Sequence, residues 1–375
     1  MSPLPTLSFF ATTCRILIYH GRGTEQWSGG SDRAAAGSSE FKGRGGQGQD
    51  IMKRCDVGSG LWQQALGRRA WLRLAGAAAL AGISRGVESD PATMHDPPAR
   101  GPAEEELEQA KAAARKVTSG TLGTVQSAHF QAVGDATEPY MNQMLLDCER
   151  IALDFLWYYR SVGFQVQRPD RRLTLIIFRD EKPFFKILPD APKNAVGVYR
   201  RDTNFFVFYD LRNARRVDSR AGRMNAITFA HETTHQLTFN TGLLNRKGDV
   251  PKCIAEGLAM YGEVPNSSGH YDPGRILYGR LRQVAAIRGA GKWVAAAELL
   301  SDDKKAQKSY DQSWLLVHFL MKHADRLPQF RAYLKTIYQR TDRNHRLEDA
   351  RAHLGDLVLL DRELFRYGIE LPGTL

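Results

Sequence analysis

A chain of 375 residues with 52 Lys and Arg against 41 Asp and Glu is longer than most single domains and carries a formal net charge of +11. Residues 1–81 contain ten basic and five acidic residues, so the remainder has 42 against 36 and a net charge of only +6. Basic residues do cluster at 212–223, but no aromatic residues are interleaved with them and they match no nucleic-acid-binding motif. We therefore expect no nucleic-acid partner.

The first 82 residues do not have the pattern of a folded domain. Residues 1–51 are rich in Gly and Ser without sustained apolar periodicity, which predicts disorder or a mis-assigned start, with Met52 as the alternative initiator. An arginine pair at 68–69 then precedes a small apolar run at 74–82 that is too short to span a bilayer. This pattern resembles a twin-arginine export signal more than an alanine-rich amphipathic helix. We predict a signal peptide at 52–82, export to the periplasm, cell envelope or medium, and no stable membrane span in the mature chain.

Residues 83–120 have the composition of a linker. A Pro-rich stretch leads into a charged segment at 103–111, which predicts a short, exposed helix with little to bury. The globular domain is predicted at 121–375.

The first part of that domain has strand patterns around one helix. Apolar alternation and β-branched residues predict the strands, and a spacing of three to four predicts the helix. The predicted strands are 127–134, 173–178, 196–199 and 204–209, and the predicted helix is 139–161. The last two strands are close enough for a hairpin. We hypothesise that the strand at 204–209 forms a sheet edge along which a peptide substrate pairs.

The motif His-Glu-Thr-Thr-His occupies 231–235, in a segment at 221–240 whose apolar spacing predicts a helix. On a helix, residues four apart lie on one face, so the imidazoles of His231 and His235 can reach a single Zn²⁺. Glu232 would then reach the metal-bound water as a general base. A string of this type arises by chance in such a chain with a probability of roughly one per cent. The motif predicts one catalytic zinc ion per chain.

A catalytic zinc ion takes three protein ligands and keeps one position open for water, so a third ligand is required. Glu256 lies on a second predicted helix, from 251 to about 263, for which Asp249 is a plausible N-terminal cap. Glu263 is the alternative ligand, but it lies two turns further on, roughly 10 Å away, so only one of the two can reach the ion. We favour Glu256, because Gly257 beside it would let two backbones approach closely.

From residue 271 onward the chain has an almost entirely helical pattern. The predicted helices are 276–287, 293–300, 310–323, 327–338, 347–355 and 361–367. The predicted fold class is α+β: a small mixed β-sheet, then the motif helix, then a mainly helical C-terminal subdomain.

The cysteines do not indicate a disulfide framework. Cys14 and Cys55 precede the apolar run of the signal, which leaves Cys148 and Cys253 in the mature chain. Both lie on apolar helical patterns, so we expect two buried free thiols in preference to a disulfide.

The motif, together with the sequence Glu-Gly-Leu-Ala at 256–259, resembles the gluzincin class of zinc metallopeptidases. The string FAHETTHQLTFNTGL at 229–243 is similar to a family of uncharacterised exported bacterial proteins with a peptidase-MA-like fold. The likeness covers about residues 125–370 and includes 310–314. It implies a gluzincin-like, zincin-type fold and peptidase activity, but it names no substrate.

The resemblance also implies roles for individual residues. The implied zinc ligands are His231, His235 and Glu256, and the implied general base is Glu232. Cys253 departs from the pattern, because an aromatic residue is expected three positions before the glutamate. That departure concerns the packing beneath Glu256 and leaves the ligand itself in place.

Gluzincins commonly use a Tyr or His from the helical part after the third ligand to stabilise the oxyanion. Tyr310 is the catalytic candidate for this role, although a tyrosine before an apolar helix is more often a core residue. Tyr261 and His270 are weaker candidates.

These features predict an exported zinc-dependent metallopeptidase that acts on a peptide or protein substrate. The alternative is a catalytically weak or inactive gluzincin-like protein that uses the fold to bind cell-envelope protein, and a non-peptidase metallohydrolase comes third. Glu232 favours the enzyme, since a structural zinc site has no use for a base beside its ligands. Nothing in the sequence indicates the oligomeric state.

Overall fold

The computed structural model describes residues 104–371, except 211, 213–218, 265–269 and 271. The predicted segments at 1–51 and 52–82, and the Pro-rich part of the predicted linker, lie outside the described residues.

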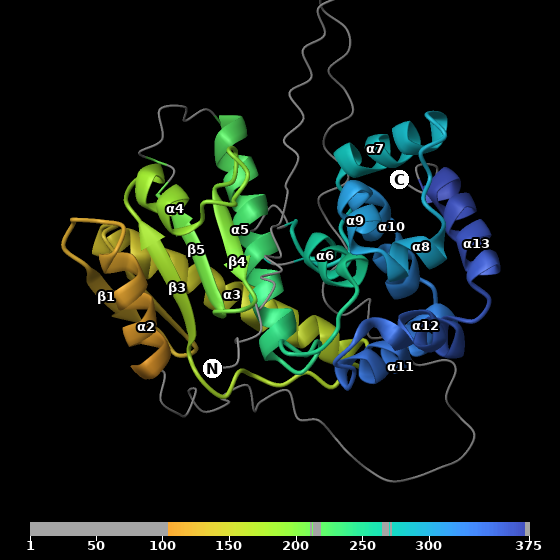
Figure 1. The fold of residues 1–375 in the computed structure, drawn as a ribbon, viewed down its shortest axis with the longest axis horizontal. Helices are drawn as coiled ribbons and strands as arrows, with labels where there is room; N and C mark the ends of the chain where they lie inside the picture. Colours follow the sequence, from red (N-terminus) through yellow and green to blue (C-terminus); the bar gives the residue numbers. More distant parts are fainter. Residues whose placement is uncertain (1–103, 211, 213–218, 265–269, 271, 372–375) are drawn as a thin grey trace, which may run out of the picture. The chain divides into compact units, whose positions relative to one another are not determined.

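Among the described residues, five strands form one mixed sheet (Figure 1). The strands are β1 (Gly123–Gln126), β2 (Phe130–Gly134), β3 (Leu173–Phe178), β4 (Gly197–Arg200) and β5 (Phe205–Tyr209). Their order is β1-β2-β3-β5-β4; β2, β3 and β5 are parallel, and β1 and β4 run antiparallel to their neighbours at the two edges. The predicted hairpin is confirmed in β4 and β5. The predicted strand at 127–134 is the second strand of another hairpin, whose first strand the sequence pattern did not reveal.

Helices cover both faces of this sheet. The helices before the motif and the motif helix itself are α2 (Glu104–Arg115), α3 (Glu138–Ser161), α4 (Glu181–Ile187) and α5 (Ser219–Asn240). In β3, Ile176 and Phe178 pack in one apolar cluster with α2 and α4, whereas Leu175 and Ile177 pack in another with α3 and α5. All residues of β3 are buried. Its continuous apolar run follows from this, because a strand covered on both faces has no solvent side.

Helix α2 is part of this packing. Leu107, Ala110 and Ala114 are buried in the apolar cluster on the outer face of the sheet. The expectation of an exposed helix at 103–111 is therefore wrong. The many glutamates conceal a stripe of small apolar residues at helical spacing, which is enough to dock a short helix on a sheet.

The strand at 204–209 does not form an edge. It corresponds to β5, which pairs with β3 on one side and β4 on the other. The hypothesis that a peptide pairs along this strand is thereby refuted. The edge strand on this side of the sheet is β4, which lies beside α5 (Figure 1).

The chain after α5 is helical throughout its described elements, as predicted. These elements are α6 (Lys252–Tyr261), α7 (Tyr278–Gly289), α8 (Ala296–Ser301), α9 (Asp303–Lys308), α10 (Tyr310–Lys322), α11 (Arg326–Tyr338), η2 (Arg343–His345), α12 (Arg346–Leu354) and α13 (Leu357–Glu370). Helices α6 and α10 make the most extensive contact among them. The predicted α+β class is confirmed.

Gly257 permits the close approach of α6 and α10. A Cβ atom at this position would lie 2.4 Å from Val317 Cγ2 and 2.6 Å from the Ser313 carbonyl oxygen, well inside van der Waals contact. The predicted reason for glycine beside Glu256 is confirmed. The first residues of α10 consequently lie next to the carboxylate that α6 carries.

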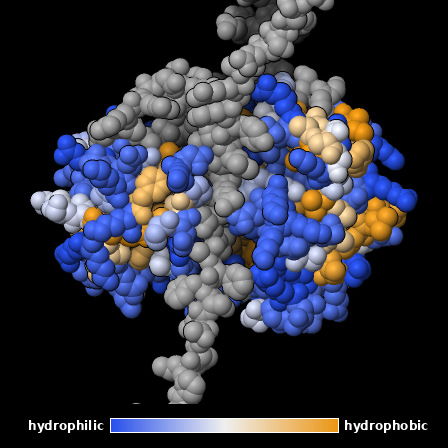
Figure 2. Space-filling model, turned by 45° about the horizontal axis from the view of Figure 1, so that its top comes forward, coloured by the Kyte–Doolittle hydropathy of each residue, from blue (hydrophilic) through white to orange (hydrophobic). Residues whose placement is uncertain are grey.

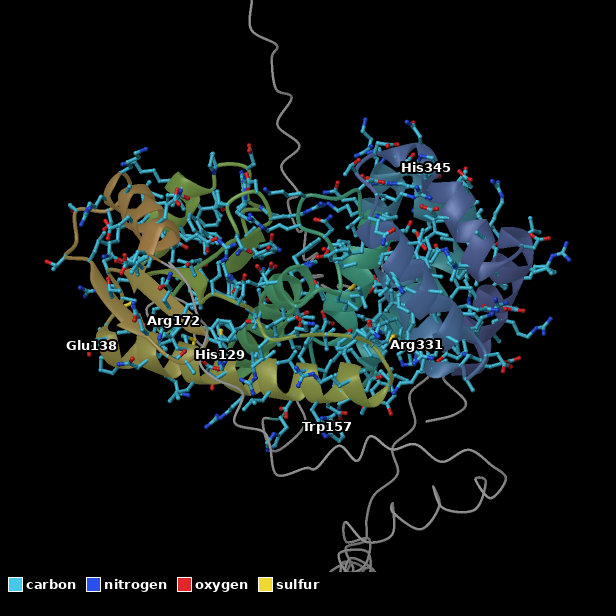
Figure 3. All side chains as sticks on the ribbon, turned by 90° about the horizontal axis from the view of Figure 1, so that it is seen from below. His129, Glu138, Trp157, Arg172, Arg331 and His345 are labelled. Carbon is cyan, nitrogen blue, oxygen red and sulfur yellow. The ribbon has the colours of Figure 1, made fainter. Side chains whose placement is uncertain are left out.

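Helix α3 links the sheet to the helical region. Its N-terminal part packs against the sheet, and beyond the sheet the Tyr158 hydroxyl contacts the Tyr261 hydroxyl of α6. At its end, Arg331 of α11 donates a hydrogen bond of 3.2 Å to the Val162 carbonyl (Figure 3). Trp157 lies on the opposite, outer face of α3 and is exposed. One apolar cluster joins residues of α3, α5, α6 and α10.

Both cysteines of the described chain are buried free thiols, as predicted. Burial raises the pKa of Cys148 and of Cys253, so both stay protonated at neutral pH.

The surface in Figure 2 is mostly hydrophilic, with hydrophobic residues in separate patches. No helix of the described chain combines the length and apolar character that a membrane span requires.

Candidate metal centre

Helix α5 carries the two motif histidines into the interior. His231 is fully buried and His235 is 6% exposed, and their ring centroids are 4.8 Å apart. The helix passes between the sheet and the helical region (Figure 1). Its buried polar residues find hydrogen-bond partners there, since Gln236 donates to the Thr174 and Asn204 carbonyls. The histidines are thus fixed by a packed helix.

Helix α6 brings Glu256 against both rings. Glu256 Oε2 lies 3.1 Å from His235 Nε2 and 3.6 Å from His231 Nε2, and one ligand atom from each of the three side chains lies within 4.8 Å of the others. Zinc bonds to nitrogen and oxygen are about 2.0–2.1 Å long, so tetrahedral ligand atoms lie about 3.3 Å apart. The donor set, two imidazoles and a carboxylate, and its spacing therefore fit a zinc ion.

Glu263 reaches the opposite side of His231. Its Oε2 lies 3.2 Å from His231 Nδ1. A carboxylate only accepts hydrogen bonds, so Nδ1 carries the proton and the Nε2 lone pair is left for a metal. The two glutamates that competed in the sequence thus take different positions: Glu256 joins the histidine nitrogens, and Glu263 orients one ring.

Glu263 is itself held by a partly buried arginine. Arg280 Nε donates to Glu263 Oε1 at 2.6 Å and Nη2 donates to Oε2 at 2.7 Å, while Nη1 donates to Asp311 Oδ1 at 2.9 Å. A bidentate pair of this kind fixes the carboxylate plane. Asp311 and Arg280 come from α10 and α7, so the helical region determines the ring orientation of His231. Sequence reasoning missed this support because its members lie far apart in the chain.

Within the part of the chain that the structure describes, one carboxylate oxygen of Glu232 is anchored and the other has no hydrogen-bond partner. Glu232 is fully buried, and its Oε2 accepts a hydrogen bond of 2.8 Å from the Tyr199 backbone N–H in β4. Its Oε1 is buried and accepts no hydrogen bond from the residues that the structure describes. Buried polar atoms are almost always paired, so an orphaned oxygen marks a position meant for a ligand or water. Burial raises the pKa of Glu232, although the neighbouring histidines oppose that shift.

The two other glutamates are held as anions. Burial acts to raise the pKa of Glu256, but its contacts with the His235 and His231 rings outweigh burial and hold this pKa well below its ordinary value. Burial likewise opposes ionisation of Glu263, and Arg280 overcomes it and lowers the pKa of that carboxyl. The ionised form is the one that binds metal.

Tyr310 lies at the same centre. Its hydroxyl donates a hydrogen bond to Glu256 Oε2, and its ring stacks against that of His231 with centroids 6.5 Å apart. Tyr310 is the first residue of α10, so the close contact of that helix with α6 places it there. The structure brings this predicted catalytic candidate to the metal-ligand group.

The weaker candidates lie elsewhere. The Tyr261 hydroxyl contacts Tyr158, and the exposed His270 lies 3.3 Å from Asp154 through Nδ1 and Oδ2. Asp249 does not cap α6; its carboxylate forms an ion pair with Arg346 at 2.5 Å. That capping prediction is wrong, because a buried arginine competes for the same carboxylate.

A cleft of about 850 Å³ opens beside the group. His235 and Glu256 form part of its lining, together with the turn after β4 and the junction of α8 and α9. The cleft gives a ligand access to the exposed side of the metal-ligand group.

Fold and site together define an α+β protein with a buried His-His-Glu group that could hold a metal ion. Residues 225–342 match the profile of a protein family described as "Protein of unknown function (DUF1570)". The matched segment contains His231, His235, Glu256 and Tyr310, and it begins after the last strand of the sheet. No curated protein matches the chain.

Proposed function

We propose that the chain is a zinc-dependent, gluzincin-like metallopeptidase that hydrolyses peptide bonds, exported by its twin-arginine-type signal. The observation that carries this proposal is that Glu232 Oε1, next to a buried His231-His235-Glu256 group, accepts no hydrogen bond from the described part of the chain. A site that only binds metal needs three or four ligands and no adjacent carboxylate. The unpaired carboxylate oxygen supports a proton-transfer role.

The residues of the chain divide the chemistry among them. His231, His235 and Glu256 would hold zinc, which when bound supplies Lewis-acid polarisation of the scissile carbonyl and the attacking water. Glu232 Oε1 would accept a proton from that water and pass it to the leaving amine, while Tyr199 N–H keeps Oε2 in place. Burial raises the pKa of Glu232, which makes it a stronger base towards the water proton. A pKa closer to neutrality also lets the same carboxyl hold that proton until the leaving amine, a much stronger base, takes it.

Tyr310 would donate its hydroxyl proton to the developing oxyanion. Replacing Tyr310→Phe removes one donor and little volume, so we expect kcat to fall by about 10²-fold while bound zinc remains stoichiometric. Steady-state kinetics together with metal analysis measure this. An unchanged kcat would show that Tyr310 only supports Glu256.

The most direct test uses the purified full-length protein and an unfolded protein such as casein. We expect about one zinc ion per chain, cleavage of casein, loss of cleavage on chelation, and recovery when zinc is restored. Two histidines and one carboxylate are also the ligand set of non-haem iron oxygenases, so the metal analysis must measure iron as well. Iron in place of zinc would contradict the proposal.

A zinc-loaded protein that cleaves no peptide would favour the second candidate, a catalytically inactive protein that uses this fold to bind cell-envelope protein. The cleft beside His235 and Glu256 is the surface that such a protein would use.

A further inference from the structure

The cleft beside the metal-ligand group has an excess of cationic side chains. Seven lysines and arginines line it: Arg200, Arg201, Arg246, Lys252, Lys304, Arg343 and Arg346. The lining carboxylates of the described chain are largely committed. Asp249 pairs with Arg346, Asp303 with Arg346 and Arg343, and Asp202 with Arg200. The other four cations, Arg201, Arg246, Lys252 and Lys304, take no part in these ion pairs.

Arg201 and Arg246 are the two of these that the backbone holds in place. Arg201 Nε donates to the Arg246 carbonyl at 2.6 Å, and Arg246 Nη1 donates to the Arg201 carbonyl at 3.3 Å. Further carbonyls, those of Asn245 and Gly248 for Arg201 and of Asp202 for Arg246, accept from the same guanidinium groups. Neither arginine forms an ion pair with a carboxylate of the described residues.

Arg201 and Arg246 therefore have no negatively charged partner in direct contact among the described residues. The carbonyls give only neutral acceptors, so a bound anion would supply the directly paired charge that the described residues do not. Burial lowers the pKa of Arg201 and the charge of Arg246 adds to that shift, whereas the nearby Tyr199, Asp249 and Asp303 oppose it without an ion pair among the described residues. The paired arginines of the same cleft, Arg200 and Arg346, have their pKa raised by their carboxylates, against the effect of burial.

A row of stacked side chains connects Arg201 to the metal-ligand group. The Arg201 guanidinium lies 4.9 Å from the centroid of the Phe239 ring, which stacks at 6.1 Å on Tyr199, which in turn stacks at 6.4 Å on His235. An extended peptide advances about 3.3 Å per residue, so about five residues suffice to reach from the centre to the arginines. The two sites are close enough to hold one substrate.

We propose that Arg201 and Arg246 form a carboxylate-binding subsite of the cleft, which selects peptides with an acidic group within about five residues of the scissile bond. The acidic group is an Asp or Glu side chain or the C-terminal carboxylate of the peptide. Arg201 Nη1 and Arg246 Nε and Nη2 take no part in these carbonyl contacts of the described chain, so they can donate to the two oxygens of a carboxylate. The inference rests on the proposed peptidase function, because the bound peptide is a substrate only if the chain is a peptidase. Its test measures binding separately from cleavage.

The test uses the zinc-loaded Glu232→Gln protein and fluorescently labelled Ala-Gly peptides with a single Glu at successive positions. Each peptide has a Gln counterpart, and each is made with a C-terminal acid and a C-terminal amide. We expect at least one Glu peptide, or the acid form, to bind about tenfold more tightly than its neutral counterpart in fluorescence anisotropy. Arg246→Gln should remove that difference and leave the affinity for the neutral peptide unchanged. The Glu and C-terminal arms separate the two sources of the carboxylate.

Arg200→Gln is the matched control, because Arg200 lines the same cleft but is already paired with Asp202. It removes the same charge and should leave the preference for the acid intact. Equal binding of Glu and Gln peptides together with equal binding of the acid and amide forms by the parent protein would overturn the subsite, as would an equal effect of both arginine variants. Thermal unfolding of each variant checks that the fold is retained. Arg246→Glu is a second test, since the reversed charge should change the preference from Glu to Lys peptides. Acid-selective binding by a protein whose wild type cleaves nothing would refute the peptidase and support the subsite.

Discussion

Replacing Glu232→Gln is expected to abolish peptide hydrolysis while the zinc content stays at that of the wild type. The substitution keeps the size of the side chain and can still accept the Tyr199 N–H, but it removes the basic oxygen. General-base catalysis contributes about 10²–10⁴-fold, and here the same carboxyl would also return the proton, so we expect a loss of kcat of at least about 10³-fold. Single-turnover cleavage of a peptide with zinc analysis of the same sample measures both quantities.

The matched control is Glu138→Gln, which makes the same change at an exposed residue on α3 (Figure 3). It should leave zinc content and kcat unaltered. Retained activity in Glu232→Gln would rule out Glu232 as the base, whatever the metal. Loss of zinc from Glu232→Gln would instead mean that Glu232 contributes to metal binding. That result would contradict its assignment as the general base.

The second large effect separates the two buried glutamates. Glu256→Gln is expected to lose stoichiometric zinc, because among the described residues it removes the one carboxylate that lies against both Nε2 atoms. Glu263→Gln should keep zinc with an affinity about 10–100-fold weaker, since its amide oxygen can still accept from His231 Nδ1 without the charge. Competition with a chelator of known affinity gives both dissociation constants.

The pair of variants has a built-in control for folding, since each replaces a buried glutamate on or just after α6. Comparable circular dichroism spectra and unequal zinc affinities would support the two roles. If Glu263→Gln lost zinc and Glu256→Gln retained it, the assignment of ligand and orienting residue would be reversed. Equal affinities would contradict the assignment of different roles to the two carboxylates.

The local patterns of the chain predicted much of the fold, and they failed at particular places. The hairpin of β4 and β5, the motif helix and the helical C-terminal region follow from alternation and helical spacing over segments long enough to show a period. Helix α2 was expected to be exposed because its charges dominate its composition, yet three small residues suffice to dock it. The prediction that β5 forms an edge was wrong, because no local pattern gives the order of strands in a sheet. That order depends on pairing between distant segments.

Part of the candidate site could also be predicted from local sequence. Helical spacing alone places His231, Glu232 and His235 on neighbouring positions of one helix, because four residues make about one turn. Gly257 next to Glu256 also indicated a close helix contact before its partner was known, since only glycine removes the Cβ that would prevent it. These features depend on residues close in sequence, and the chain carries them in its local pattern.

Only the tertiary structure decided what surrounds those residues. The choice between Glu256 and Glu263 depends on where α7 and α10 place Arg280 and Asp311, and a helical period cannot distinguish two glutamates on one face. The anchor of Glu232 is a backbone N–H of β4, a donor that every residue other than proline possesses and no motif reveals. Only the structure likewise shows that Arg201 and Arg246 form no ion pair with a carboxylate of the described residues, because ion pairing depends on distance in space and not on order in the chain.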